Sequence, residues 1–124
     1  MNPAKILIID DNPADSDLIA NILKGKAYAL TCVYSGKEGL KKLKEEKFDL
    51  IILDLILPDA KGEDLCLSIK KSRSLRKIPV IVCSIKDDVS DIEELFIRGA
   101  DEYIIKPPRA PHLVNSIEKL LSKR

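Results

Sequence analysis

Five polar residues follow apolar runs of the sequence, and their types suit phosphoryl chemistry on a divalent cation. They are three carboxylates, a hydroxyl and an ammonium: Asp10, Asp11, Asp54, Ser84 and Lys106. Acids that meet at a buried edge repel one another, and a hard cation with oxygen ligands supplies the compensating charge. Magnesium favours one or two carboxylates, several waters and a phosphate oxygen. We expect Asp11 and Asp54 to be direct Mg²⁺ ligands, with Asp10 binding directly or through water.

One of these acids could also act as a nucleophile. A carboxylate forms an acyl phosphate when the charge on the incoming phosphoryl group is neutralised. Catalysis then consists mainly of positioning and electrostatics, with the cation on one side and Lys106 on another. Ser84 could donate a hydrogen bond to a phosphoryl oxygen.

The elements that must position these residues follow from the hydrophobic pattern. Short apolar runs predict strands and longer amphipathic stretches predict helices. Their alternation predicts an α/β fold with a parallel sheet, whose carboxyl-terminal edge would carry all five side chains. Runs such as 50–53 lack polar alternation, which is typical of strands covered by helices on both faces. We expect strands at about 4–9, 29–34, 49–53, 78–83 and 102–105, and helices at about 14–25, 36–46, 63–72, 89–98 and 110–122.

Several smaller features predict helix ends and core positions. Ser90, with Glu93 three residues later, fits a capping box at the start of the fourth helix. The apolar stripes of the helices, including Leu18 in the first and Phe96 in the fourth, are expected to face the core. The three cysteines form no CxxC or Cys/His cluster, so we expect small buried residues rather than a disulfide or zinc site.

The composition limits the function classes. A chain of 124 residues suits one domain, 1–124, and its net charge of +1 gives no reason to expect direct binding of nucleic acid. No apolar stretch approaches the roughly 20 residues that span a bilayer. The N-terminus reaches Ile6 with one lysine and then meets acids, unlike a signal peptide. We expect a cytoplasmic protein with no membrane contact.

With these residues in view, the sequence resembles the receiver domain of two-component response regulators over its whole length. The pair Asp10-Asp11 resembles the acidic pair after the first strand of that family. Asp54, followed by Pro58 and Gly62, resembles the phospho-accepting aspartate and its loop.

The second half of the chain strengthens the resemblance. Ser84 occupies the Ser/Thr switch position of the family. The segment 99–107, with the sequence GADEYIIKP, matches a family signature in which Tyr103 is the switch aromatic residue and Lys106 the phosphate-binding lysine.

The resemblance implies a flavodoxin-like, doubly wound sheet of five strands in the order 2-1-3-4-5, with five helices. It implies a phosphorylation-controlled signalling switch, not an enzyme with a separate substrate, that catalyses only its own phosphotransfer and dephosphorylation. Magnesium would be bound by Asp10, Asp11, Asp54 and the main-chain carbonyl of Ile56. The peptide bond Lys106-Pro107 would be cis.

The resemblance also implies partners and a conformational change. The phosphoryl donor would be a sensor histidine kinase or a phosphotransfer protein, and the output would reach a downstream effector, with a homodimer possible. On phosphorylation, Ser84 and Lys106 would reposition and Tyr103 would shift inward, changing the surface of the fourth helix, fifth strand and fifth helix.

Two residues depart from the family pattern. Ile85 stands where a small residue is usual, which bears on phosphorylation kinetics. Pro108 stands where an aromatic residue is frequent, which bears on the loop before the last helix. Lys86, next to Ile85, could reach back over the acyl phosphate.

Three alternatives use similar parts. A phosphatase of the haloacid dehalogenase type needs a second acid two residues after its nucleophile, whereas Asn12 and Pro13 follow the acidic pair here. A flavodoxin-like cofactor binder would share the expected fold, and fold alone does not fix function. Such a protein needs a hydroxyl- or glycine-rich loop after the first strand, where this sequence has Asp10, Asp11 and Asn12. A degenerate receiver would act through protein contacts alone, and the complete acidic set argues against it.

Overall fold

Five strands alternate with five helices along residues 2–123, which the computed structural model describes. The elements are β1 (Ala4–Ile9), α1 (Pro13–Ile22), β2 (Tyr28–Val33), α2 (Gly36–Glu45), β3 (Leu50–Leu53), α3 (Gly62–Lys71), β4 (Val80–Ser84), α4 (Val89–Ile97), β5 (Glu102–Ile105) and α5 (Ala110–Ser122). All ten predicted elements are therefore confirmed, with ends that differ from the prediction by at most three residues. No helix among these residues has the length and apolar content needed to cross a membrane.

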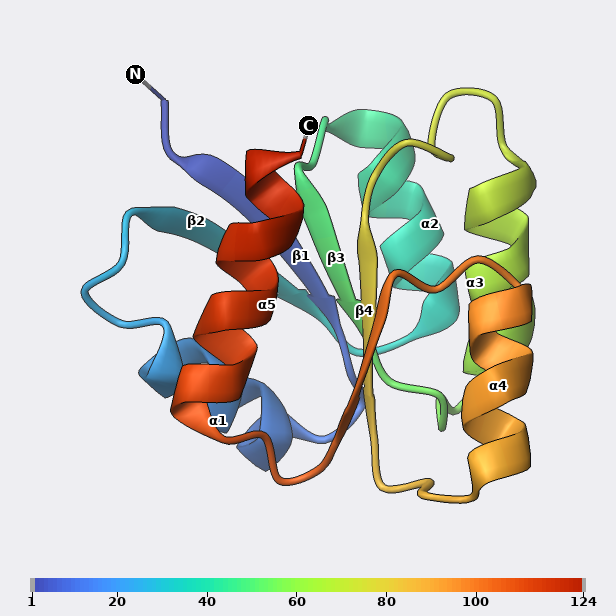
Figure 1. The fold of residues 1–124 in the computed structure, drawn as a ribbon. Helices are drawn as coiled ribbons and strands as arrows, with labels where there is room; N and C mark the ends of the chain where they lie inside the picture. Colours follow the sequence, from blue (N-terminus) through green and yellow to red (C-terminus); the bar gives the residue numbers. More distant parts are fainter. Residues whose placement is uncertain (1, 124) are drawn as a thin grey trace.

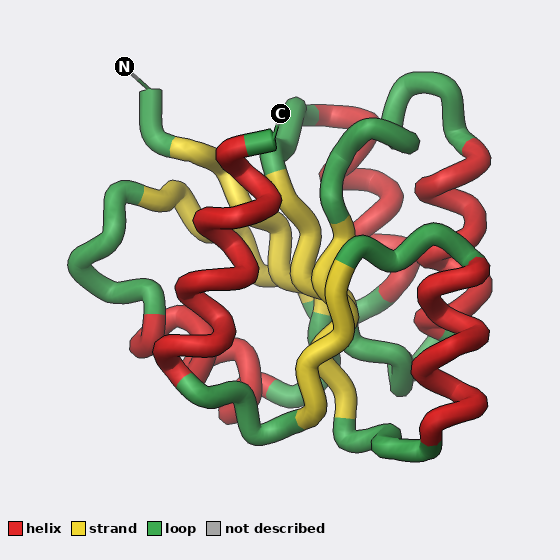
Figure 2. The backbone as a smooth tube through the Cα atoms, viewed as in Figure 1, coloured by secondary structure: helices red, strands yellow, loops and turns green. Residues whose placement is uncertain are grey.

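The strands form one parallel sheet in the order β2-β1-β3-β4-β5, as the resemblance implied. Helices α1 and α5 cover one face, and α2, α3 and α4 cover the other (Figure 1). The strands all run in the same direction, so their carboxyl ends and the loops that follow them gather at one edge (Figure 2).

The core consists of two apolar layers, one on each face of the sheet. Alternate residues of β1 belong to different layers: Ile6 and Ile8 contact the layer of α1 and α5, whereas Leu7 and Ile9 contact the layer of α2 to α4. All four are fully buried. This explains the unbroken apolar runs of the central strands, since helices cover both faces.

Two local predictions were wrong. Asp88, not Ser90, caps α4, and its carboxylate accepts hydrogen bonds from the backbone N–H of Ser90 (2.8 Å) and from its hydroxyl (2.6 Å). An aspartate caps a helix as well as a serine does, and with Asp88 as the cap the helix begins at Val89, the predicted position. Leu18 and Phe96 lie partly exposed at the edges of their helical stripes.

The cysteines agree better with their expected role. Cys66 and Cys83 are buried, Cys32 is half-buried, and all three are free thiols. Burial raises the pKa of the Cys83 thiol to about 12, so it stays protonated at neutral pH.

Candidate functional site

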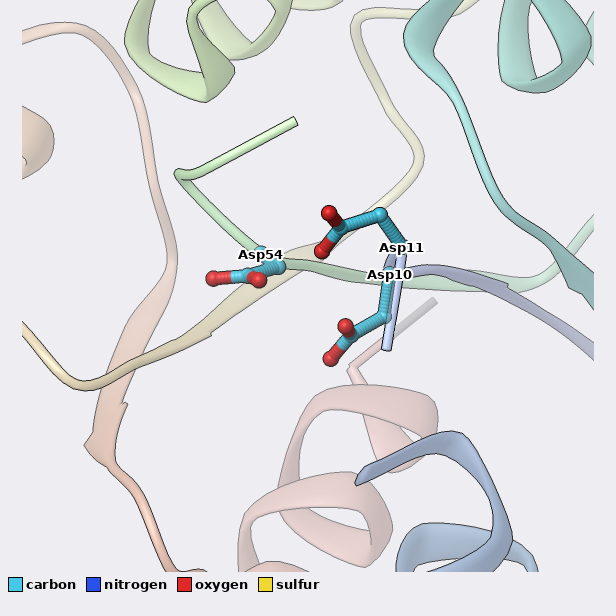
Figure 3. Close-up of side chains that lie close together, drawn as sticks. All are labelled: Asp10, Asp11 and Asp54. Carbon is cyan, nitrogen blue, oxygen red and sulfur yellow. The ribbon is translucent and has the colours of Figure 1, made fainter. Parts of the chain in front are cut away.

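Three carboxylates converge where β1 and β3 end. Asp10 and Asp11 directly follow β1, and Asp54 directly follows β3, its neighbour in the sheet. One oxygen from each lies within 4.8 Å of the others, and the three side chains lie close together (Figure 3). Asp10 and Asp54 are buried and Asp11 is exposed, so the group opens to solvent on one side.

The ammonium of Lys106, directly after β5, lies among these acids. Its Nζ is 2.9 Å from Asp10 Oδ2 and 3.3 Å from Asp54 Oδ2, and its side chain is only 7% exposed. A third carboxylate, Asp15 Oδ2 on α1, lies at 2.7 Å, the shortest of the three contacts. A lysine ammonium has three N–H donors, so these carboxylates can occupy all of them.

Burial and charge act in opposite directions on these groups. Burial raises the pKa of Asp54, and the nearby Lys106 offsets only part of that rise. Burial alone would lower the pKa of Lys106, but hydrogen bonds to Asp15 and Asp10 and the charges of Asp10 and Asp54 raise it above its ordinary value. Lys106 therefore stays positively charged. The ionised form of Asp54 is destabilised by burial, and further positive charge nearby would stabilise it.

Ser84 ends β4, beside the acidic group. The backbone N–H of Lys106 donates to the carbonyl of Ser84 at 2.8 Å, which fixes the two residues side by side. The Ser84 side chain is fully buried, and its hydroxyl accepts a hydrogen bond from the backbone N–H of Lys86 at 3.3 Å. The structure thus places Ser84 at the predicted edge, with its hydroxyl engaged by the β4–α4 loop.

Tyr103, the expected switch aromatic residue, lies inward in this structure. Its side chain is 8% exposed and belongs to the core layer of α2 to α4. Its hydroxyl donates to the backbone carbonyl of Lys86 at 2.8 Å. The inward position is stabilised by two contacts, because the ring packs in the core and the hydroxyl has an acceptor.

Lys86 points elsewhere than predicted. Its Nζ forms an ion pair with Glu63 Oε2 in the first turn of α3, at 2.9 Å. This hydrogen bond raises the pKa of Lys86 above its ordinary value. The lysine therefore joins the β4–α4 loop to α3 instead of reaching over Asp54.

The loop after Asp54 is fixed by close backbone packing. The N–H of Gly62 donates to the carbonyl of Leu55 at 2.8 Å, and the N–H of Ile56 lies 3.5 Å from Asp54 Oδ1. The carboxylate of Asp59 accepts from the N–H groups of Gly36 and Lys37, at 2.8 and 2.9 Å, which ties this loop to the start of α2. After β5, the Lys106-Pro107 peptide is cis, as expected.

Gly62→Ala is expected to destabilise the fold by about 1–3 kcal/mol. A Cβ at this position would lie 2.4 Å from Leu55 Cα and 2.5 Å from the carbonyl oxygen of Asp54, so the backbone that carries Asp54 would have to move. Urea unfolding measures the loss. Lys61→Ala, in the same turn but with its Cβ already present, is the control, and equal stability of the two variants would contradict the packing argument.

Two residues of the site were missed by the sequence reading. Asp15 and Glu63, which lie in the first turns of α1 and α3, were not among the predicted site residues. The sequence does contain a signal for Asp15. Asn12-Pro13 is a strong helix start directly after the acidic pair, and Asp15 lies in the first turn of that helix. Which charge it would meet depended on β5, far along the chain.

Comparison with known proteins agrees with this geometry. The family model of the response regulator receiver domain matches residues 6–118. The two-component response regulator ORR11 of Oryza sativa subsp. japonica is 32% identical over 120 residues, covering 96% of this chain and 82% of the relative. The response regulator ArlR of Staphylococcus saprophyticus is 33% identical, but this chain, 97% of which aligns, spans only 53% of it. The chain therefore belongs to the response regulator receiver domain family of two-component signalling.

Solved structures share the fold. The CheY-like receiver domain protein from Methanospirillum hungatei superposes with a TM-score of 0.89 at 30% identity, covering 98% of this chain and 95% of that one. The Mn²⁺-bound form of response regulator Rcp1 superposes with a TM-score of 0.81 at 25% identity, covering 97% and 91%. The latter shows that a relative with this fold holds a divalent cation.

The donors at the β1–β3 edge fit a hard divalent cation. Three carboxylates within 4.8 Å of one another offer only oxygen ligands, and one is exposed. Mg²⁺ prefers oxygen ligands and retains several waters, which an open edge allows. No thiol or imidazole belongs to this group, so the donor set favours Mg²⁺ over softer metals.

Proposed function

We propose that this chain is a phosphorylation-controlled switch that accepts a phosphoryl group on Asp54 from the phosphohistidine of a sensor histidine kinase or a phosphotransfer protein. The observation that carries the proposal is the position of Asp54, buried at the sheet edge between the Lys106 ammonium and the carboxylate of Asp11. Family membership supports the same reaction.

The chemistry balances without a further reactant. An oxygen of the Asp54 carboxylate attacks the donor phosphorus and forms a P–O bond, while the P–N bond of phosphohistidine breaks. The electron pair of that bond stays on the imidazole nitrogen. Lys106 meets the charge that gathers on the phosphoryl oxygens, and the Ser84 hydroxyl, at the end of the adjacent strand, can donate to one of them.

Asp11 and Asp54 would hold the metal directly, with Asp10 bound directly or through water and the carbonyl of Ile56 completing the protein ligands. Bound Mg²⁺ supplies positive charge that neutralises the phosphoryl oxygens during transfer. The protein holds the carboxylates in place beforehand, because each follows the end of a rigid central strand.

Intact-mass spectrometry tests the proposed function. The wild-type protein is incubated with a small acyl phosphate and Mg²⁺, or with the same donor and excess chelator. We expect the mass gain of one phosphoryl group only when Mg²⁺ is present. Equal labelling with and without the metal would contradict the proposal.

Lys106→Ala is expected to separate phosphorylation from its structural consequence. The variant retains the nucleophile and the metal ligands, so Asp54 should still be modified. The variant lacks the cation that links a phosphoryl group to β5. The changes in amide chemical shift that phosphorylation causes in α4, β5 and α5 should therefore largely disappear. NMR spectra of the phosphorylated variant measure this. The full wild-type shift pattern would contradict the role of Lys106, and Lys24→Ala serves as a distant control.

Ile85→Ala is expected to speed both phosphorylation by small donors and loss of the phosphoryl group. Ile85 directly follows Ser84 and is 65% exposed, so it can restrict access to the edge, and a β-branched side chain does not easily turn aside. Metal affinity and stability should change little. Fluorescence kinetics at matched Mg²⁺ measure the rates, with Val89→Ala, also exposed, as control. Unchanged or slower rates would show that Ile85 points away from the site.

A further inference from the structure

We propose that Asp15 is a positioning residue that competes with the phosphoryl group for Lys106. The inference rests on the proposed phosphorylation of Asp54. The carboxylate of Asp15 makes the shortest contact of the Lys106 ammonium, 2.7 Å, against 2.9 Å for Asp10 and 3.3 Å for Asp54. Asp15 is the one member of the three that lies on a helix instead of at a strand end.

The start of α1 holds Asp15 in place. Asp10 Oδ1 accepts from the N–H of Asn12 at 2.9 Å, and the Asn12 side chain in turn accepts from the N–H groups of Ala14 (2.9 Å) and Asp15 (3.4 Å). Pro13 at the first helical position fixes φ further. The carboxylate therefore comes from a well-ordered turn attached to the acidic pair itself.

This contact opposes the repositioning of Lys106. The ammonium donates hydrogen bonds to Asp15 and Asp54 and is 2.9 Å from Asp10, so a phosphoryl oxygen competes with carboxylates that already surround it. The phosphoryl oxygens lie two bonds beyond the carboxylate oxygen of Asp54, and Lys106 must follow them. Asp10 can retain the lysine near the edge, whereas Asp15 holds it toward α1. Asp15 also adds a negative charge 2.7 Å from the ammonium that an anionic phosphoryl group must approach.

Both effects predict the same direction. Asp15→Asn keeps the shape of the side chain but removes its charge, so Lys106 should bind a phosphoryl group more readily. Beryllofluoride, a tetrahedral analogue of a phosphoryl group, is the probe, titrated in saturating Mg²⁺ and followed by NMR. We expect an affinity about three to ten times higher than that of the wild type. Mg²⁺ affinity, titrated separately, should change less than this.

Asp17→Asn is the matched control. It removes the same charge from the same helix two residues later, and Asp17 is exposed. If Asp15→Asn and Asp17→Asn raise the affinity equally, the effect is general electrostatics and the inference is overturned. Wild-type protein that binds no beryllofluoride would overturn the proposed function, and this inference with it.

A double-mutant cycle tests whether Asp15 acts through the lysine. Asp15→Asn is repeated in a Lys106→Met background, which keeps the apolar stem of the lysine but not its charge. The gain in beryllofluoride affinity should then fall to the gain seen with the Asp17→Asn control. A gain that persists in full without the ammonium would show that Asp15 does not act by holding Lys106.

Discussion

Asp54→Asn is expected to abolish phosphorylation. The amide lacks the charged oxygen that forms the acyl phosphate. Asp10 is also buried and also contacts Lys106, but only Asp54 follows a strand, β3, that is the direct neighbour of β4, which Ser84 ends. Peptide mapping by mass spectrometry, after incubation with a small phosphodonor and Mg²⁺, measures the modification. A stable label elsewhere on the wild-type chain, with Asp54 unmodified, would contradict the assignment.

The same variant should not unfold the protein, which makes the loss of labelling interpretable. Burial raises the pKa of Asp54, so at neutral pH its ionised form costs the folded state free energy. Lys106 retains Asp10 and Asp15 as partners, so it is not left buried without a counter-charge. We expect the metal-free variant to melt at the same temperature as the wild type, or a few degrees higher. A large fall in melting temperature would show that the Asp54–Lys106 contact stabilises the fold.

Asp11→Asn is expected to weaken Mg²⁺ binding by about 10- to 100-fold or more. Asp11 is the exposed member of the acidic group, and it supplies one of the few charged oxygens available to a cation at this edge. Isothermal titration of Mg²⁺ into both proteins measures the change. Phosphorylation of the variant should recover at high Mg²⁺, because the nucleophile is intact.

The control for Asp11 is again Asp17→Asn. It changes the net charge by the same amount, but Asp17 does not belong to the carboxylate group at the β1–β3 edge. Its Mg²⁺ affinity should stay within about twofold of the wild type, as expected for a solvent-exposed charge. Equal affinities for wild type and Asp11→Asn would show that Asp11 is not a ligand.

The sequence by itself determined the fold class and most of the edge. Unbroken apolar runs such as 50–53 are buried on both faces when helices cover both sides of the sheet. The alternation of such runs with amphipathic stretches therefore predicted the parallel sheet. In a parallel sheet, residues after strand ends must meet at one edge, which explains why Asp10, Asp11, Asp54 and Lys106 could be grouped before any contact was known.

The tertiary structure decided how the side chains at that edge are partnered. Lys106 meets Asp15 across 91 positions of the chain, and Lys86 meets Glu63 across 23. A long charged side chain has many rotamers. Which of several nearby acids it pairs with depends on distances that are set only when the helices pack. Tyr103 lies inward for the same kind of reason: a core site for its ring and a carbonyl acceptor for its hydroxyl coincide only in the folded chain.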